Sequence, residues 1–416
     1  MTGKLIASLW GERSPRRWAV LFFYALAAIL FAYVAAINAA ANITRRKNAD
    51  LALSLVPSEP VALTLKADLK FLSSQSKASL SPVEALVKSS LRQQPLNATA
   101  VRLLGYVADL RGQPTVAQEY IRLATKISRR EFGAQLWLIE AAAAKEDVPT
   151  ALRHYDIALR STEKSRAVLF PTLADALANP EVRRQLLPYL RQPSNWMWAF
   201  VSDTIDTNEN PEYIAETLVA AGQLSIPDEY RSLPDRLLAR LAAKSRYDTF
   251  RQYYRSLPGA NLAIFTAAGL NATTVNLPYP IAGWQMNDGV ATGGDFAKAN
   301  DKQFVLNVFA GSGERGQIMQ KLMFLAPGRY LFSARYHVSE MAPGADVRWD
   351  FKCLRTEGSD SLWFAASPLR QGNFAQAAKF IVPSDCPNQI LQLQAAGGPG
   401  QNGVEFSVRY VAIQPR

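Results

Sequence analysis

The side chains most able to do acid–base or nucleophilic chemistry are few and far apart. The chain has two histidines, His154 and His337, in segments of different predicted structure. Asp346 and Asp350 lie four residues apart on a predicted strand, so both carboxylates share one face about 13 Å apart, at roughly 3.3 Å per residue. That separation exceeds the carboxyl spacing of both glycosidase mechanisms. We therefore expect no catalytic residues, and neither a His-based triad nor a histidine metal site.

Cysteine usage indicates a structural role. Cys353 and Cys386 are the only cysteines, and no C-x-x-C motif or Cys/His cluster is present, so we expect no metal or redox site. In an oxidising compartment two cysteines in one β-domain are expected to form a disulfide. The alternative is two buried free thiols, which a cytoplasmic location would require.

Motifs for nucleotides, phosphate and nucleic acid are missing. No Walker A loop, G-x-S-x-G, G-x-G-x-x-G or EF-hand occurs, so we expect no cofactor. The glycine-rich run 397–403 joins two predicted strands, which is typical of a hairpin loop and not of a phosphate-binding loop. The net charge is +11, from 46 basic and 35 acidic residues, but the basic residues are scattered. Without a contiguous basic stripe, nucleic acid is not an expected partner.

Residues 18–41 (WAVLFFYALAAILFAYVAAINAAA) have no charge and can cross a hydrocarbon core of about 30 Å as a helix. Three basic residues precede this segment and three follow it, so the positive-inside rule is nearly balanced. Lys4, the free amino terminus and the cysteine pair favour a cytoplasmic tail at 1–17 and a body outside. The alternative is a signal peptide cleaved near Ala39-Ala40-Ala41, although the apolar run is longer than a usual signal core.

After a linker at 42–61, residues 62–257 have helical patterns and an internal period. Four pairs of residues match at an offset of 34: Leu104 and Leu138, Ala117 and Ala151, Ile121 and Tyr155, Ala124 and Ala158. Two antiparallel helices per unit explain the spacing, because Gly105 allows a close helix approach and the small alanines form the seam. One such unit cannot bury its apolar face alone, so several must stack.

These positions resemble the tetratricopeptide repeat family over about residues 64–165. The resemblance implies a helical solenoid with a concave surface for a protein partner. Val101 stands where the family prefers Trp, Ile139 replaces the second unit's Gly, and Arg129 replaces the unit-end Pro. A generic array of helical hairpins is the alternative. Further helices without a tidy repeat are expected at 167–177, 180–190, 196–205, 211–221, 235–242 and 247–257.

Composition changes near Gly259, where helical patterns stop. We expect a linker at 258–280 and a β-domain at 281–416. Eight short β-type runs lie at 304–309, 317–324, 328–339, 346–353, 362–366, 375–381, 389–395 and 403–413. Their number and spacing predict two packed antiparallel sheets. The expected fold class is therefore multi-domain α + β: a transmembrane helix, an α-helical solenoid and a β-sandwich.

The layout of 281–416 resembles the jelly-roll carbohydrate-binding modules. It has an opening Gly283-Trp284, an apolar-Pro-Gly-Arg-Tyr turn, a Trp-x-x-x-Cys strand ending at Cys353, and a Val-Pro-x-x-Cys turn ending at Cys386. The resemblance implies a glycan ligand stacked on exposed aromatic rings, because the C–H face of a sugar is apolar. The candidate glycan contacts are Trp284, Tyr336, Trp349 and Trp363. The alternative for each is core packing.

Together these patterns favour a non-enzymatic scaffold and binding protein. We expect a single-pass protein of a bacterial inner membrane with a periplasmic body, a protein partner on the repeats and a possible glycan on the sandwich. By fold-level analogy, extracellular polysaccharide assembly or export is the expected setting. The alternatives are a purely structural scaffold without sugar binding, a cytoplasm-facing assembly factor, and a glycan hydrolase.

Overall fold

The computed structural model describes residues 15–416 except 74–76, 276, 288, 301–302, 341–342, 356–357 and 400–402. Most of the expected tail 1–17 lies outside these residues, and so does the centre of the glycine-rich run 397–403. The described chain divides into two compact units, 1–166 and 167–416. The helices after residue 166 thus group with the sandwich, although the sequence placed them with the repeats.

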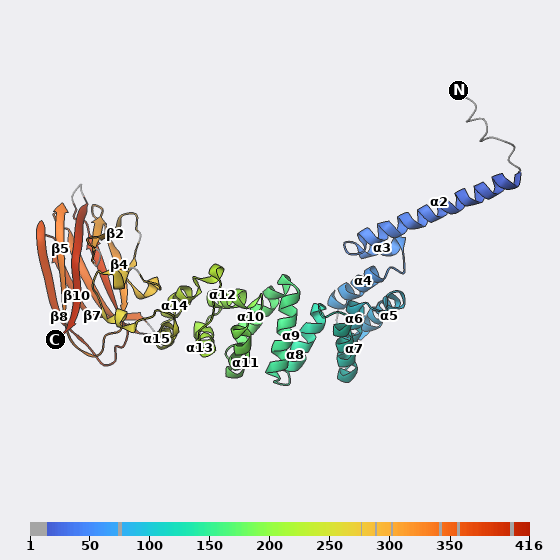
Figure 1. Cartoon of the computed structure of the whole chain (residues 1–416), viewed down its shortest axis with the longest axis horizontal. Coiled ribbons are helices and arrows are strands. Elements are labelled where there is room, and N and C mark those ends of the chain that lie inside the picture. Colours follow the sequence, from blue (N-terminus) through green and yellow to red (C-terminus); the bar gives the residue numbers. More distant parts are fainter. Residues whose placement is uncertain are drawn as a thin grey trace, which may run out of the picture. The chain divides into compact units, whose positions relative to one another are not determined.

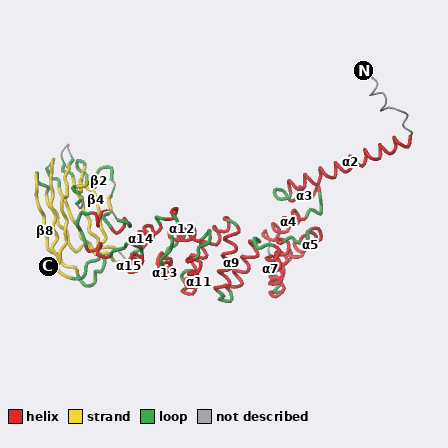
Figure 2. The backbone as a smooth tube through the Cα atoms, viewed as in Figure 1, coloured by secondary structure: helices red, strands yellow, loops and turns green. Residues whose placement is uncertain are grey.

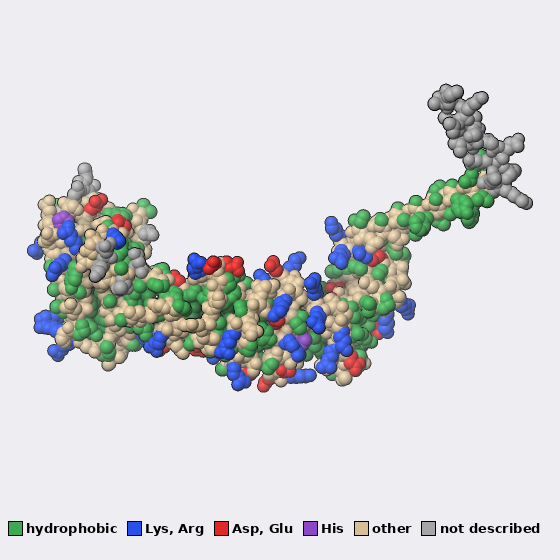
Figure 3. All heavy atoms as spheres, in the orientation of Figure 1, with side chains coloured by type: hydrophobic (Ala, Val, Ile, Leu, Met, Phe, Trp, Pro, Cys, Tyr) green, Lys and Arg blue, Asp and Glu red, His purple; other side chains and the backbone are tan. Residues whose placement is uncertain are grey.

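The first unit is helical (Figure 1; Figure 2). Its helices are α2 Pro15–Thr44, α3 Ala49–Leu55, α4 Pro60–Ser73, α5 Lys77–Gln93, α6 Ala98–Leu110, α7 Pro114–Ile127, α8 Phe132–Ala143 and α9 Val148–Ser161. Helix α2 contains one stretch, Trp18–Thr44, that is long and apolar enough to cross a membrane, with none of its most apolar window buried. Figure 3 shows hydrophobic side chains along this helix.

Helices α6 to α9 repeat the same geometry every 34 residues. Helix α8 begins at Phe132, 34 residues after α6 begins at Ala98, and α9 begins at Val148, 34 residues after α7 begins at Pro114. The turn after α6 has Gly112 at φ 74°, and the equivalent turn after α8 has Glu146 at φ 56°. The period seen in the side chains is therefore also a period of the backbone.

The predicted seam residues lie between these helices. Ala117, Ala124 and Ala158 are fully buried, Ala151 is nearly so, and Leu104 and Leu138 are half-buried. A Cβ on Gly105 would lie 2.9 Å from two side-chain carbons of Ile121 and 3.3 Å from the Ala117 carbonyl oxygen, so glycine lets α6 approach α7 this closely without displacing Ile121.

An ion-pair ladder connects successive repeat units. Arg102 on α6 lies 2.9 Å from Asp68 on α4 and 2.8 Å from Glu131 at the start of α8. Trp137 on α8 also donates through Nε1 to Asp109 Oδ2 at 3.0 Å. Because Arg102 is buried, leaving its charge without either partner would be costly, so the ladder stabilises the register of the stacked pairs.

The second unit begins with six further helices and ends in strands. The helices are α10 Arg166–Ala176, α11 Pro180–Arg191, α12 Met197–Thr207, α13 Pro211–Ala221, α14 Leu233–Ala243 and α15 Tyr247–Ser256, and a short α16 follows at Ala272–Val275. The aromatic group Trp196, Trp198 and Phe200, at the start of α12, is buried.

The segment 258–280 is packed, although the sequence suggested a linker. Phe265 is fully buried, and its ring centroid lies 4.6 Å from that of Phe324 and 5.7 Å from that of Phe250 on α15. Arg251 lies over the ring of Phe324 and donates to Asn388 Oδ1 at 2.5 Å. This aromatic cluster, Phe250, Phe265 and Phe324, explains why α15 and the sandwich belong to one unit.

The strands form two five-stranded antiparallel sheets. Their bounds are β1 Gln285–Met286, β2 Thr292–Lys298, β3 Phe304–Ala310, β4 Arg315–Met323, β5 Gly328–Glu340, β6 Asp346–Arg355, β7 Gly358–Pro368, β8 Gly372–Val382, β9 Gln389–Ala396 and β10 Val404–Pro415. The first sheet has the order β1-β4-β9-β6-β7, and the second has the order β2-β3-β10-β5-β8. Inward side chains of both sheets build one hydrophobic core.

Candidate functional site

The titratable groups considered for chemistry are held in structural contacts. His154 Nδ1 lies 2.7 Å from Gln135 Oε1, and burial lowers the pKa of His154. Asp346 forms an ion pair with Arg315, and Asp350 forms one with Arg348. Within the described residues, no group of three or more His, Cys, Asp or Glu side chains could hold a metal ion.

Cys353 and Cys386 form a disulfide. Cys353 lies on β6 and Cys386 in the turn before β9, with their Cα atoms 5.6 Å apart. Both side chains are fully buried. The bond links the end of one strand to the start of the neighbouring strand of the same sheet.

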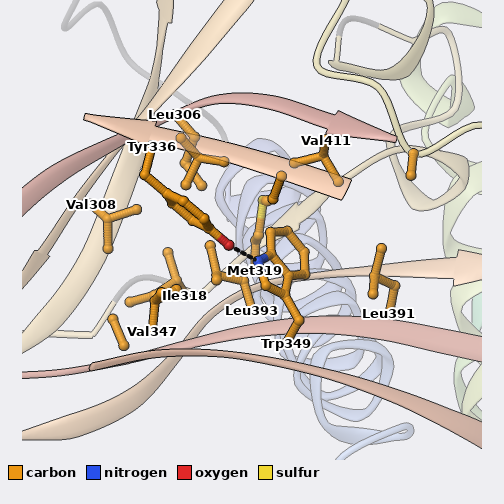
Figure 4. Close-up of a cluster of buried hydrophobic side chains, with 14 of the residues drawn as sticks. Leu306, Val308, Ile318, Met319, Tyr336, Val347, Trp349, Leu391, Leu393 and Val411 are labelled. Carbon is orange, nitrogen blue, oxygen red and sulfur yellow. Dashed lines mark hydrogen bonds between the residues drawn. The ribbon is translucent and has the colours of Figure 1, made fainter. Parts of the chain in front are cut away.

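Three of the four aromatic residues expected to contact sugar are instead in the core. Trp349, Tyr336 and Trp284 are 0%, 1% and 5% exposed. Trp349 Nε1 donates to Tyr336 Oη at 2.6 Å (Figure 4). Tyr336 Oη in turn donates to Gln376 Oε1 at 2.7 Å. Burial raises the pKa of Tyr336. Tyr336 on β5 and Trp349 on β6 face the other sheet, and the Trp284 ring centroid lies 6.0 Å from that of Trp349, so these rings cannot stack on a surface sugar.

Trp363 occupies an intermediate position on the edge strand β7. In the strand register it is opposite Phe351, and because Phe351 faces inward, Trp363 does too. Its ring centroid lies 4.9 Å from that of Phe332 and 5.6 Å from that of Phe380. Trp363 is therefore a half-buried core residue at the margin of the sandwich.

Phe364, which follows Trp363 on β7, points outward. Phe364 is 57% exposed, although the Arg348 guanidinium lies 4.4 Å from its ring centroid. Arg348 in turn donates from Nε and Nη2 to Asp350 at 2.8–3.0 Å. The ion pair anchors the guanidinium, and the guanidinium steadies the exposed ring.

Phe364 ends a row of side chains on the outer side of the first sheet, in which Phe364 is exposed, the three glutamines are half-buried and Asp350 is 2% exposed beneath its neighbours. The register aligns Phe364 on β7 with Asp350 on β6, Gln392 on β9, Gln320 on β4 and Gln285 on β1. We call these five residues the amide row.

A further glutamine of β4 packs against the amide row. Gln392 Nε2 donates to Gln320 Oε1 at 3.1 Å and to Gln317 Oε1 at 2.9 Å. Gln392 Oε1 is shielded from solvent and accepts no hydrogen bond from the described residues. Shielded acceptors nearly always have a hydrogen-bond donor, so the unpartnered Gln392 Oε1 is an unusual feature of this face.

The amide row cannot be predicted from the sequence, for a physical reason. Its members come from five strands, and only the sheet order brings them together. The available signal was strand alternation: Trp349 and Phe351 face inward, so Asp350 must face outward.

No protein-family model matches the chain, and no curated protein matches it. Solved structures similar to the C-terminal part are β-sandwich carbohydrate-binding modules. TmCBM61 in complex with β-1,4-galactotriose is 13% identical, and the match covers 32% of this chain and 88% of that one, with a TM-score of 0.23. CBM6cm-2 from Cellvibrio mixtus lichenase 5A in complex with cellotriose is 11% identical, covering 36% and 97%, with a TM-score of 0.22. At these scores the likeness says nothing of a ligand for this chain.

Proposed function

We propose that this protein is a membrane-anchored, non-enzymatic glycan-binding scaffold of the bacterial envelope. The observation that carries the proposal is the amide row, in which an exposed Phe364 ring lies on the same face as three glutamines and an anchored Arg348–Asp350 pair. The repeats supply a second surface, for a protein partner.

The amide row has the two properties that sugar recognition needs. A sugar has an apolar C–H face, which an exposed ring such as Phe364 covers. It also has hydroxyls that both donate and accept, and a glutamine amide does both. The face is therefore suited to a neutral stretch of polysaccharide.

The anchor and the disulfide support a body outside the cytoplasm. Helix α2 offers an apolar segment with mean hydropathy 2.5 over its best window. The Cys353–Cys386 disulfide is the kind of bond that persists in an oxidising compartment such as the periplasm. Together they favour a cytoplasmic N-terminus with the helical units and sandwich on the periplasmic side. Fusions of alkaline phosphatase and of a fluorescent protein to Arg416 test this orientation, and an active fluorescent fusion without phosphatase activity contradicts it.

The helical array of the first unit is suited to a protein partner. Stacked helix pairs of tetratricopeptide type present one helix of each pair along an inner surface. The Asp68–Arg102–Glu131 ladder holds α4, α6 and α8 in register, so that surface is preformed. Polysaccharide assembly or export is the setting that unites such a surface with a glycan face.

A second candidate function is a structural scaffold whose sandwich binds no sugar. The burial of Trp284, Tyr336 and Trp349 favours it, because these rings stabilise the fold and offer nothing to a ligand. The two candidates differ in one respect, which is whether the amide row has a ligand.

A glycan array separates them. The full chain is solubilised in a detergent without a sugar headgroup and probed against neutral and acidic bacterial oligosaccharides. Phe364→Ala removes the exposed ring, and Phe309→Ala is the matched control, since Phe309 is a 41% exposed phenylalanine on the other sheet. We expect at least one neutral glycan to be retained by the wild type and Phe309→Ala and lost by Phe364→Ala. No retention of any glycan leaves only the structural scaffold.

A further inference from the structure

The outer face of the second sheet contains a separate basic hollow. The register of β10 against β5 shifts between Val408 and Tyr410, so Arg409 is an extra residue. Arg409 and Tyr410 are both exposed, whereas strict alternation would bury one of them. A β-bulge changes the direction in which side chains point, and here it places Tyr410 on the outer face beside Arg409.

The bulge lies beside an open hollow of about 570 Å³. Its polar lining consists of Arg335 on β5, Arg409 and Tyr410 on β10, Asn373 at the start of β8 and Gln303 just before β3. Tyr336, Phe374 and Ala375 complete the lining. The volume is within the range of small-ligand sites, roughly 300–1,000 Å³. Asn373 is oriented by His337, whose Nδ1 lies 2.9 Å from Asn373 Oδ1.

Arg335 is positioned by a ring and not by a carboxylate. Its guanidinium carbon lies 5.2 Å from the centroid of Tyr410, which it faces in register. Stacking holds the plane of the guanidinium while leaving its N–H groups available. A guanidinium held in this way can offer two parallel donors to a carboxylate.

The hollow has two cations and no anion among its lining residues. Elsewhere in the sandwich Arg315, Arg348 and Arg355 each hold an aspartate. Arg335 and Arg409, in contrast, form no ion pair within the part of the chain that the structure describes. Glu405 is on the same strand face as Arg409 but four residues away, roughly 13 Å along the strand. The positive charge of the hollow is therefore not neutralised by a described neighbour.

We infer that this hollow binds the carboxylate of an acidic saccharide, with Arg335 and Arg409 on the carboxylate and Tyr410 and Asn373 beside the sugar ring. The site is on the opposite sheet from the amide row and goes beyond the proposed function, since it makes the ligand a uronate-containing polysaccharide. Two cations and a single ring already covered by Arg335 fit one acidic sugar unit better than a nucleic-acid strand, which needs a longer basic track and several stacking rings.

Titration of the full chain with hexuronate tetramers tests the inference. Tetramers of galacturonate, mannuronate and guluronate are compared with their carboxyl-reduced counterparts. The variants are Arg335→Met, Arg335→Lys and Arg409→Met, and the matched control is Lys379→Met, an exposed cation four residues from Ala375 on the same sheet. Phe364→Ala separates this site from the amide row.

We expect a hexuronate tetramer to bind at least tenfold more tightly than its reduced form, with an affinity that falls as salt is added. Arg335→Met and Arg409→Met should each weaken it about tenfold or more, and Arg335→Lys should not restore it, while Lys379→Met and Phe364→Ala should leave it within twofold. Failure of all the hexuronates to bind, equal binding of the reduced forms, or tighter binding of a single-stranded oligonucleotide of equal charge would overturn the inference.

Discussion

Trp349 Nε1 donates a 2.6 Å hydrogen bond to Tyr336 Oη in the middle of the sandwich, so a strand of each sheet contributes one partner. The two residues are among the largest fully buried side chains of the described chain. A polar contact at this depth is satisfied only while the two sheets are packed. The pair is therefore a fold-specifying contact between β5 and β6.

Removing either partner should destabilise the protein without changing ligand binding. Tyr336→Phe leaves the Trp349 indole N–H and the Gln376 amide without their partner, which costs about 1–3 kcal/mol. We expect Trp349→Phe to cost a similar amount or more, because it also creates a cavity. Denaturant unfolding of the full chain measures both changes, and glycan binding by the folded variants should equal that of the wild type. Loss of glycan binding by a variant that keeps wild-type stability would show instead that Tyr336 or Trp349 belongs to the ligand site.

The disulfide should contribute to stability and should exist in the cell. Replacing Cys353 and Cys386 together by serine is expected to cost about 2–4 kcal/mol, since the bond closes a loop of 33 residues. In intact cells neither cysteine should react with a membrane-permeant maleimide until reductant is added and the protein is denatured. Labelling before reduction would place the thiols in the cytoplasm and would contradict the proposed orientation.

Lys321 should make stability depend on pH. It is buried at the inward position of β4, its Nζ donates to the Ala282 carbonyl at 2.6 Å, and burial lowers its pKa to about 7 from 10.5. The native state thus binds fewer protons than the unfolded state between pH 7 and 10.5, so this residue adds stability as the pH rises through that window and is most costly below pH 7.

Lys321→Met removes the titrating group. The free energy of unfolding of the variant, relative to wild type, should be most favourable near pH 6 and should decline by several kcal/mol towards pH 10, even though the Ala282 carbonyl loses its donor. Thermal or denaturant unfolding at four pH values measures the trend. If the difference in the free energy of unfolding between Lys321→Met and the wild type does not change with pH, Lys321 keeps its ordinary pKa.

The repeat geometry predicts a stabilising substitution. Glu146 is exposed and has φ 56°, at the position where the preceding unit has Gly112 at φ 74°. Because glycine adopts this conformation without steric cost, Glu146→Gly should stabilise the protein by about 0.5–1 kcal/mol. Gly112→Ala, at the equivalent position, should destabilise it by a similar amount. Denaturant unfolding of both variants measures the two changes in the free energy of unfolding. Changes of the same sign would contradict the structural equivalence of Glu146 and Gly112.

Local patterns predicted most of the elements. Alternation along β5 and β10 and the short β-type runs anticipated eight strands, all of which are present. The 34-residue offsets anticipated the helix pairs of the first unit. Strand β2 was missed because Thr292-Gly293-Gly294 reads as a loop, yet a Cβ on Gly294 would collide with the Asn307 carbonyl of β3, so glycine is required in this strand.

The candidate sites were harder to predict because they depend on the pairing of distant strands. Leu362-Trp363-Phe364 has apolar residues of both parities, and only the pairing of Trp363 with Phe351 shows that Phe364 faces outward. The bulge at Arg409 likewise depends on the register with β5. The packed segment 258–280 lacks a helix or strand period, so burial of Phe265 could not be read from its neighbours.

The proposed function requires the amide row to contact glycan in the cell, and photo-crosslinking at the exposed Phe364 ring tests this requirement. A benzophenone amino acid replaces Phe364 in the full chain, or replaces Phe309 on the other sheet as control, and the cells are irradiated intact. We predict that the Phe364 position yields an adduct that stains for carbohydrate and is removed by periodate cleavage of sugar diols, while the Phe309 position does not. Adducts at Phe364 that contain only protein, or equal carbohydrate labelling at both positions, would contradict the claim.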